Sequence, residues 1–169
     1  MNPVLAAWNA ADAAEASKAI LACCGAKRWA AAMAAARPIT SIDELRITAD
    51  RTWSQMTEPD WLEAFACHPR IGERKAAHTT PKSTSWSSQE QSSTATAASA
   101  ILEEIAAGNQ HYEELFGFTY IVCATGKSAK EMLAILKRRL NSDRATELRE
   151  AAEQQRQITQ IRLQKWLAE

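Results

Sequence analysis

The sequence predicts an all-α fold, a single-domain helical bundle of about eight helices. Glycine and proline number only five each in 169 residues, whereas strong helix formers such as alanine, leucine and glutamate are abundant. Apolar residues recur at helical spacing along most of the chain. The one β-branched and aromatic run, residues 118–124, lacks a partner with which to form a sheet. We therefore expect one domain over residues 1–169, which is long enough to bury roughly two-thirds of its unfolded surface.

Three helices are expected before residue 40. The first covers about residues 3–8. The second covers about residues 12–24 and ends at Gly25, a residue common after helix C-termini. The third covers about residues 26–36 and stops before Pro38.

Two start signals define the next helices. Ser41-Ile42-Asp43-Glu44 is a capping box, in which the side chains of the first and last residues satisfy backbone N–H groups at a helix start. Thr57-Glu58-Pro59-Asp60 opens another helix, with proline in the first turn, where its missing N–H costs nothing. This second helix leads to His68.

The middle of the chain predicts a long loop and then a long helix. Residues 73–88 are polar and rich in serine and threonine, which favours a loop that is either functional or a linker. We expect a helix over residues 87–107, ended by Gly108-Asn109, and a short helix carrying Tyr112, Leu115 and Phe116.

The last part predicts a buried extended segment and two helices. Residues 118–124 are expected to lie extended between helices, because a strand without a partner is unstable. A second capping box, Ser128-x-x-Glu131, opens a helix, and the final helix covers about residues 143–166.

His68 is the first candidate functional residue. Pro69 disfavours helical backbone in the residue before it, and Gly72 lets the chain turn away. An imidazole held at a helix end titrates near neutral pH and is a candidate acid or base. The structural alternative is a histidine that only interacts with the dipole of the helix C-terminus.

Glu90 is the second candidate. Ser87, Glu90 and Gln91 cluster at the first turn of the predicted helix, where backbone N–H groups attract anionic oxygen. The alternative is again structural, because Ser87-x-x-Glu90 is itself a capping box. Arg162, in the last helix, has apolar neighbours; it either extends its charged end to solvent or turns inward to hold a carboxylate or carbonyl.

Four elements together resemble one known family, the cofactor-free 2-oxo-4-hydroxy-4-carboxy-5-ureidoimidazoline (OHCU) decarboxylases. They occur in the right order and span nearly the whole chain: His68-Pro69-Arg70-Ile71-Gly72, Trp86–Gln91, Gly117–Ser128 and Arg138-Arg139-Leu140-Asn141. The resemblance implies an all-α fold and the decarboxylation of OHCU to (S)-allantoin and carbon dioxide in urate degradation. It also implies a homodimer.

The resemblance implies site residues as well. The family's catalytic histidine, glutamate and arginine fall on His68, Glu90 and Arg162, the last through the short Ile-x-x-Ile-Arg-Leu pattern. Its substrate contacts fall on Pro69, Ser87, Gln91 and the main chain of Ile121, Val122, Cys123 and Ala124.

The substrate that the resemblance implies needs no cofactor, because its imidazoline ring delocalises the electrons left by carbon dioxide. The protein then has to position the carboxylate, bind the ring oxygens and deliver a proton to one face. We expect His68 to act as acid or base, Glu90 to orient the imidazole and bind substrate N–H groups, and Arg162 to stabilise negative charge on oxygen.

Composition excludes several other classes. Twenty basic and twenty acidic residues leave no net charge, which argues against nucleic acid or an anionic membrane as the partner and favours a small molecule. No stretch is long enough to span a bilayer, and no signal peptide is recognisable. The four cysteines show no C-x-x-C pair, so we expect buried, reduced thiols in a cytoplasmic protein.

Two other functions stay open at this point. A metal hydrolase would use His68, His78 and His111 with Glu73 or Glu90, but no ligand pair at metal-binding spacing supports it, and we expect no metal. A helical interaction module without catalysis would leave the His-Pro turn and the serine- and threonine-rich segment unexplained.

Overall fold

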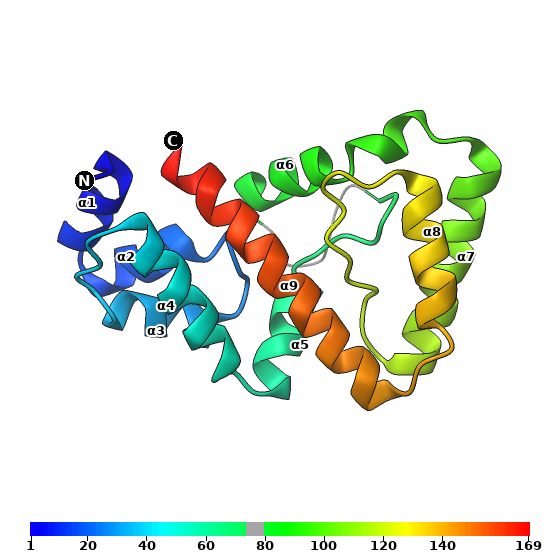
Figure 1. The fold of residues 1–169 in the computed structure, drawn as a ribbon, viewed down its shortest axis with the longest axis horizontal. Coiled ribbons are helices and arrows are strands. Elements are labelled where there is room, and N and C mark those ends of the chain that lie inside the picture. The colour runs from blue at the N-terminus through cyan, green and yellow to red at the C-terminus, as the bar shows by residue number, and fades with distance from the viewer. Residues whose placement is uncertain (74–79) are drawn as a thin grey trace. The chain divides into compact units, whose positions relative to one another are not determined.

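The computed structural model describes residues 1–73 and 80–169, and this part of the chain contains nine α-helices, one 3-10 helix and no strand (Figure 1). The prediction of an all-α fold is confirmed, and the number of helices is close to the expected eight or so. The elements are α1 (Pro3–Ala10), α2 (Ala13–Ile20), α3 (Lys27–Ala35), α4 (Ile42–Ser54), α5 (Glu58–Ala66), α6 (Pro81–Glu90), η1 (Ser92–Thr96), α7 (Ser99–Phe116), α8 (Ala129–Arg139) and α9 (Arg144–Leu167).

The chain divides into two compact units. The first consists of Met1–Ala64 with Arg156–Glu169, and the second of Phe65–Gln155. Helices α5 and α9 therefore contribute residues to both units. That residues 1–169 act as one domain stays a prediction.

Helices α1 to α4 belong to the first unit, and side-chain caps determine where three of them begin. Asn2, Asp12 and Ser41 each accept a hydrogen bond from the backbone N–H three residues further on. Trp29 of α3 is fully buried in the core of this unit. Apolar packing between the helices therefore stabilises this unit, and side-chain caps accept hydrogen bonds from N–H groups at the N-termini of α1, α2 and α4.

The core of the second unit is an aromatic cluster. Tyr112 on α7 contacts Phe116, Phe118 and Tyr120, with ring centroids 4.7, 5.7 and 5.4 Å apart respectively. These geometries are tilted or edge-on, as aromatic pairs prefer. The cluster joins α7 to the segment that follows it in the chain.

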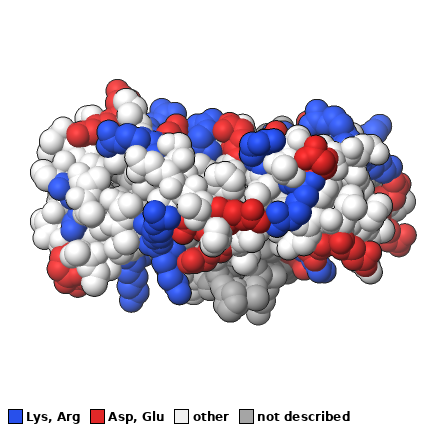
Figure 2. All heavy atoms as spheres, turned by 90° about the horizontal axis from the view of Figure 1, so that it is seen from below, with Lys and Arg blue, Asp and Glu red and all other residues white. Residues whose placement is uncertain are grey.

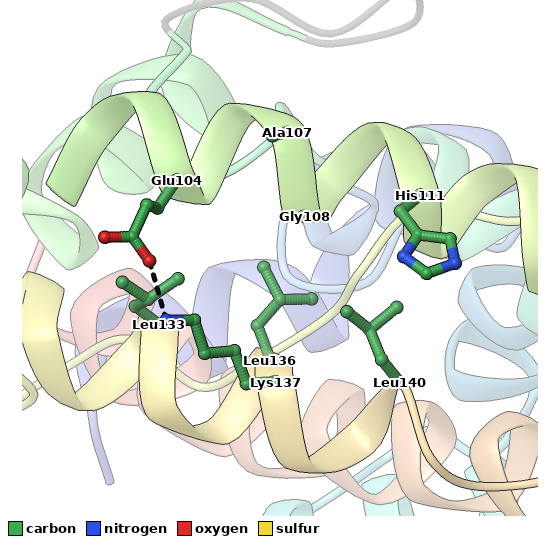
Figure 3. Close-up of a pocket in the computed structure, with 8 residues that line it drawn as sticks. All are labelled: Glu104, Ala107, Gly108, His111, Leu133, Leu136, Lys137 and Leu140. Carbon is green, nitrogen blue, oxygen red and sulfur yellow. Dashed lines mark hydrogen bonds and ion pairs between the residues drawn. The ribbon is translucent and has the colours of Figure 1, made fainter. Parts of the chain in front are cut away.

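Helix α7 runs without interruption through Gly108, where the sequence predicted a helix end. A Cβ atom at this position would lie 2.6 Å from the Cδ2 atom of Leu136 on α8, so glycine is needed here for close helix packing (Figure 3). The helix ends instead at Gly117, which has a φ of 81° in the left-handed region. The predicted end at residue 107 and the separate short helix are therefore wrong.

Helix α6 occupies residues that were predicted to form a loop. The Thr80 side chain accepts a 3.1 Å hydrogen bond from the backbone N–H of Ser83, and Pro81 takes the first helical position. Tertiary packing overrides the weak helix propensity of serine and threonine, because Ser83, Trp86 and Ser87 are buried. The loop prediction is wrong from residue 81 onward, and its residues 74–79 lie outside the described residues. The predicted helix over residues 87–107 is also wrong, since α6 ends at Glu90 and η1 separates it from α7.

Residues 118–124 form the buried segment without regular secondary structure that the sequence predicted. Arg139 of α8 donates a 2.5 Å hydrogen bond to the carbonyl of Ile121 and pairs with Glu147 of α9. Tyr112 donates to the same carboxylate at 2.5 Å. Burial is the main reason that the pKa of Tyr112 lies far above its usual value, so the phenol keeps its proton and remains a donor. A buried polar network therefore anchors the start of this segment.

Within residues 1–73 and 80–169, no helix is both long and apolar enough to cross a bilayer. Figure 2 shows basic and acidic side chains interspersed over the face drawn, in keeping with the balanced composition. Of the four cysteines, Cys23, Cys24 and Cys123 are buried and Cys67 is half-buried, and no disulfide joins them in the described chain. The expected burial of these thiols is confirmed for three of the four.

Candidate active site

The His-Pro turn lies where the sequence predicted it. Helix α5 ends at Ala66, and the backbone N–H of His68 still donates to the carbonyl of Phe65 at 3.1 Å. Pro69 is buried, and Gly72 has a φ of 92°, which residues with a side chain rarely adopt. The backbone is therefore constrained on both sides of the imidazole.

Two buried side chains from other elements hold this turn. The Gln91 Oε1 atom accepts a 2.9 Å hydrogen bond from the backbone N–H of Gly72. Asn109 of α7 donates from Nδ2 to the carbonyl of Ile71 at 3.1 Å. Because Gln91 directly follows Glu90, the first of these bonds ties the end of α6 to the turn that carries His68.

Ser87 and Glu90 lie in the last turn of α6, so the predicted capping box and its N-terminal anion site are wrong. Thr80 and Pro81 start the helix earlier than the sequence interpretation placed it. A carboxylate near a helix C-terminus is unfavourable to the helix dipole. The half-buried Glu90 therefore does not stabilise α6 as an N-terminal cap.

The segment Ile121–Ala124 uses part of its backbone within the protein. The Ile121 carbonyl accepts from Arg139, and the Cys123 carbonyl accepts from Lys127 Nζ at 2.7 Å. The Ala124 carbonyl accepts from the backbone N–H of Lys127 at 3.0 Å. Three carbonyls of this segment therefore already accept hydrogen bonds within the protein.

Two adjacent glutamines of α9, which the sequence interpretation missed, connect these pieces. Gln154 Oε1 accepts a 2.8 Å hydrogen bond from the backbone N–H of Cys123, and Gln155 Oε1 lies 2.6 Å from His68 Nε2. One helix turn therefore holds both the imidazole and the extended segment. The available signal was periodicity, because Gln155 falls four residues after buried Ala151 and three before buried Ile158.

A polar cavity of about 380 Å³ borders Glu90 and the end of the extended segment. Its lining residues are Gln89, Glu90, Ser92, Ser93, Ala124, Thr125, Gly126, Lys127 and Ser128. Burial raises the pKa of the nearby Cys123 thiol, and the Lys127 ammonium opposes this only in part. The thiol is therefore protonated near neutral pH and is not an activated nucleophile.

The second unit thus brings together the His68 turn, the end of α6 with Ser87, Glu90 and Gln91, and the segment Ile121–Ala124. Arg162 belongs to the first unit, where it is 2% exposed and donates from Nη1 to the carbonyl of Ala22 at 3.1 Å. Its side chain is turned inward, as one of the two sequence interpretations required, and does not extend to solvent.

Two other features bear on alternative sites. No group of three histidine, cysteine, aspartate or glutamate side chains is arranged to hold a metal among the described residues, and His78 lies outside them. A second cavity, of about 280 Å³, lies between α7 and α8 (Figure 3), with an apolar floor of leucines and a Lys137–Glu104 ion pair at its rim. His111, a candidate ligand in the metal-hydrolase alternative, lines this cavity, and none of the residues expected to act on OHCU does.

The comparisons with known proteins identify the family. The model of the OHCU decarboxylase family matches residues 9–164, which is most of the chain. The chain belongs to the OHCU decarboxylase family. The family that the sequence motifs predicted is therefore confirmed, and the match runs through both compact units.

Two known proteins illustrate the similarity in sequence. The chain is 37% identical over 144 residues to the uric acid degradation bifunctional protein TTL of Arabidopsis thaliana, covering 85% of this chain and 44% of that protein. The chain thus spans less than half the length of this relative. It is 28% identical over 144 residues to the OHCU decarboxylase of Haloferax volcanii, covering 80% of this chain and 79% of that protein.

Among solved structures, the fold is similar to a crystal structure of OHCU decarboxylase in the presence of (S)-allantoin. The TM-score is 0.76 and the sequence identity is 37%, and the match covers 88% of this chain and 96% of the chain in that structure. A crystal structure of (S)-allantoin synthase matches with a TM-score of 0.72 at 18% identity, covering 96% of this chain and 53% of that one; this match supports the fold alone.

Proposed function

We propose that this chain decarboxylates OHCU to (S)-allantoin and carbon dioxide, a step of urate degradation, without a metal or an organic cofactor. The family match over residues 9–164 carries this proposal. The geometry of the second unit supports it, because Gln91, Gln154 and Gln155 join three predicted site elements through hydrogen bonds.

The reaction places specific demands on the site. Loss of carbon dioxide from a carboxylate consumes one proton overall, and the electron pair of the broken carbon–carbon bond passes into the imidazoline ring. The protein must therefore take the hydroxyl proton of the substrate, bind the ring and ureido groups, and return a proton to the ring carbon from one side. These tasks need an acid or base near neutral pH and a fixed set of donors and acceptors.

The residues of this chain match these demands. His68 takes up the hydroxyl proton, and Glu90 binds substrate N–H groups and helps to orient the imidazole. Ser87, Gln91, Pro69 and the backbone of Ile121–Ala124 contact the substrate, and Arg162 stabilises negative charge on its oxygen. Buried polar residues such as Ser87 and Arg162, both 2% exposed, fit roles that need exclusion of water.

The test is a turnover assay with matched controls. OHCU is generated from urate by the two preceding enzymes, and optically active allantoin is followed by circular dichroism. His68→Asn should fold normally and lose on the order of a hundred- to ten-thousandfold of turnover. The control His111→Asn changes an exposed histidine of α7 and should keep full activity. Unchanged turnover in His68→Asn would remove His68 from the mechanism.

The carboxylate is tested in the same assay. Glu90→Gln keeps the size of the side chain and an oxygen that accepts hydrogen bonds, but it removes the negative charge. Glu103→Gln makes the same change on an exposed face of α7 and serves as the control. We expect only Glu90→Gln to lose turnover, with little change in thermal unfolding. Full activity in Glu90→Gln would return Glu90 to a structural role.

The proposal includes a homodimer, which the family resemblance implies, and a cytoplasmic location, which the expected reduced cysteines imply. Sedimentation equilibrium of the purified chain tests the first point, since a particle of one chain mass, 18.6 kDa, would contradict it.

A further inference from the structure

The imidazole of His68 has a close, buried partner on α9. Its Nε2 atom lies 2.6 Å from the Oε1 atom of Gln155, a short distance for a bond between nitrogen and a carbonyl-type oxygen. Gln155 is completely buried, at 0% exposure. A contact of this length holds the ring in one orientation.

A buried glutamine on the apolar stripe of a helix is costly unless it is hydrogen-bonded. Leaving such a polar group without a partner costs its free energy of desolvation, whereas leucine at the same position would bury apolar surface instead. Helix packing alone therefore does not explain Gln155. Its contact with His68 supplies a polar partner for its amide oxygen.

We propose that Gln155 is a positioning residue that keeps the proton of neutral His68 on Nε2. An amide oxygen only accepts hydrogen bonds, so the ring nitrogen opposite Gln155 Oε1 must be the donor. The lone pair is then on Nδ1, and this nitrogen takes the substrate proton. This inference rests on the acid–base role proposed for His68.

The neighbouring glutamine supports this assignment. Gln154 uses both ends of its amide, since Oε1 accepts from the Cys123 N–H at 2.8 Å and Nε2 donates to Glu150 at 3.1 Å. Two consecutive side chains of α9 thus present amide oxygens to two parts of the candidate site. The rigid helix sets the spacing between the imidazole and the segment expected to bind substrate carbonyls.

The tautomer is measured directly, without turnover. The chain has three histidines, and the resonances of His68 in long-range ¹H–¹⁵N spectra are identified by their loss in His68→Asn. We expect the Nε2–H form in the unmodified protein and in Gln155→Glu, whose carboxylate also accepts. Gln155→Leu should give a mixture of the two tautomers. An Nδ1–H form in the unmodified protein, or an unchanged tautomer in Gln155→Leu, would overturn the inference.

Turnover supplies a second measurement. Gln155→Leu should lower kcat roughly tenfold or more with a smaller change in KM, because a wrong tautomer impairs the proton transfer rather than binding. Gln155→Glu should recover a large part of that loss, and it also guards against a folding defect specific to leucine. The control Gln110→Leu, on an exposed face of α7, should leave both kcat and the His68 tautomer unchanged.

The two proposals fail in different ways. If His68→Asn loses turnover but Gln155→Leu keeps the unmodified tautomer and kcat, only the positioning role is overturned. If His68→Asn keeps full turnover, the proposed role of His68 falls, and the inference about Gln155 falls with it.

Discussion

Breaking the buried ion pair between Arg139 and Glu147 should destabilise the protein far more than breaking an exposed pair on the same helix. Arg139 is 3% exposed and Glu147 is 1% exposed, so Arg139→Met leaves a carboxylate without its counter-charge away from water. Removing one partner of such a pair typically costs about 3–5 kcal/mol. In a chain of this size each kcal/mol lowers the melting temperature by roughly 2–4 °C, so we expect a fall of about 6–20 °C.

Lys137, two residues earlier on α8, provides the matched control. It pairs with Glu104 at 2.6 Å, but these side chains are 61% and 52% exposed. Exposed pairs contribute about 0–1 kcal/mol, so Lys137→Met should lower the melting temperature by less than about 4 °C. Both changes replace a basic side chain of α8 by the same residue.

Differential scanning calorimetry compares the two variants with the unmodified protein. A double variant, Arg139→Met with Glu147→Leu, should recover part of the loss, because both buried charges are then removed. Equal melting temperatures for Arg139→Met and Lys137→Met would refute the reasoning that burial sets the strength of the Arg139 pair.

Two further predictions concern single contacts. The hydrogen bond from the Thr57 backbone N–H is the main cause that lowers the pKa of Asp60, and Arg28 lowers it further. The charged Asp60 side chain therefore stabilises the fold above the usual pKa of 3.8. This stabilisation is lost as the pH falls through the pKa of Asp60 in the folded state. Asp60→Asn should therefore cost about 1–2 kcal/mol in urea unfolding at pH 7 and little at pH 2; an equal cost at both pH values would contradict this. Gly108→Val should lower the free energy of unfolding by about 1–3 kcal/mol, because the valine side chain overlaps with Leu136. The double variant Gly108→Val with Leu136→Ala should be less destabilised than the sum of the two single changes. Strict additivity would show that the two positions do not compete for space.

The elements that the sequence predicted well are those whose signals are local. The capping residues Asp12, Ser41 and Ser128 each mark the start of a helix within a residue, and Pro69 marks the turn at His68. These signals act through the backbone of the residues beside them, so no distant contact overrides them. The extended character of residues 118–124 was predictable for the same reason.

The errors fall where a distant contact decides the outcome. Helix α6 forms in a serine- and threonine-rich segment because Trp86 and Ser87 pack into the protein, which composition does not reveal. Gly108 continues α7 rather than ending it, because α8 approaches there. The error in α6 also moved Glu90 to the wrong end of a helix, although its family assignment did not depend on that placement.

Helix α9 shows why polar residues on a buried stripe point to function. Glu147, Gln155 and Arg162 are each at most 2% exposed, at positions where apolar side chains recur every three or four residues. Each of these side chains would destabilise the protein if it were buried without a polar partner. Glu147 is paired with Arg139 and Tyr112, Gln155 contacts His68, and Arg162 donates to the Ala22 carbonyl. A helix selected for packing alone has no need of such residues. Their presence weakens the amphipathic signal of α9. Two of them, Gln155 and Arg162, are residues that we expect to serve the reaction, whereas Glu147 belongs to the buried ion pair with Arg139.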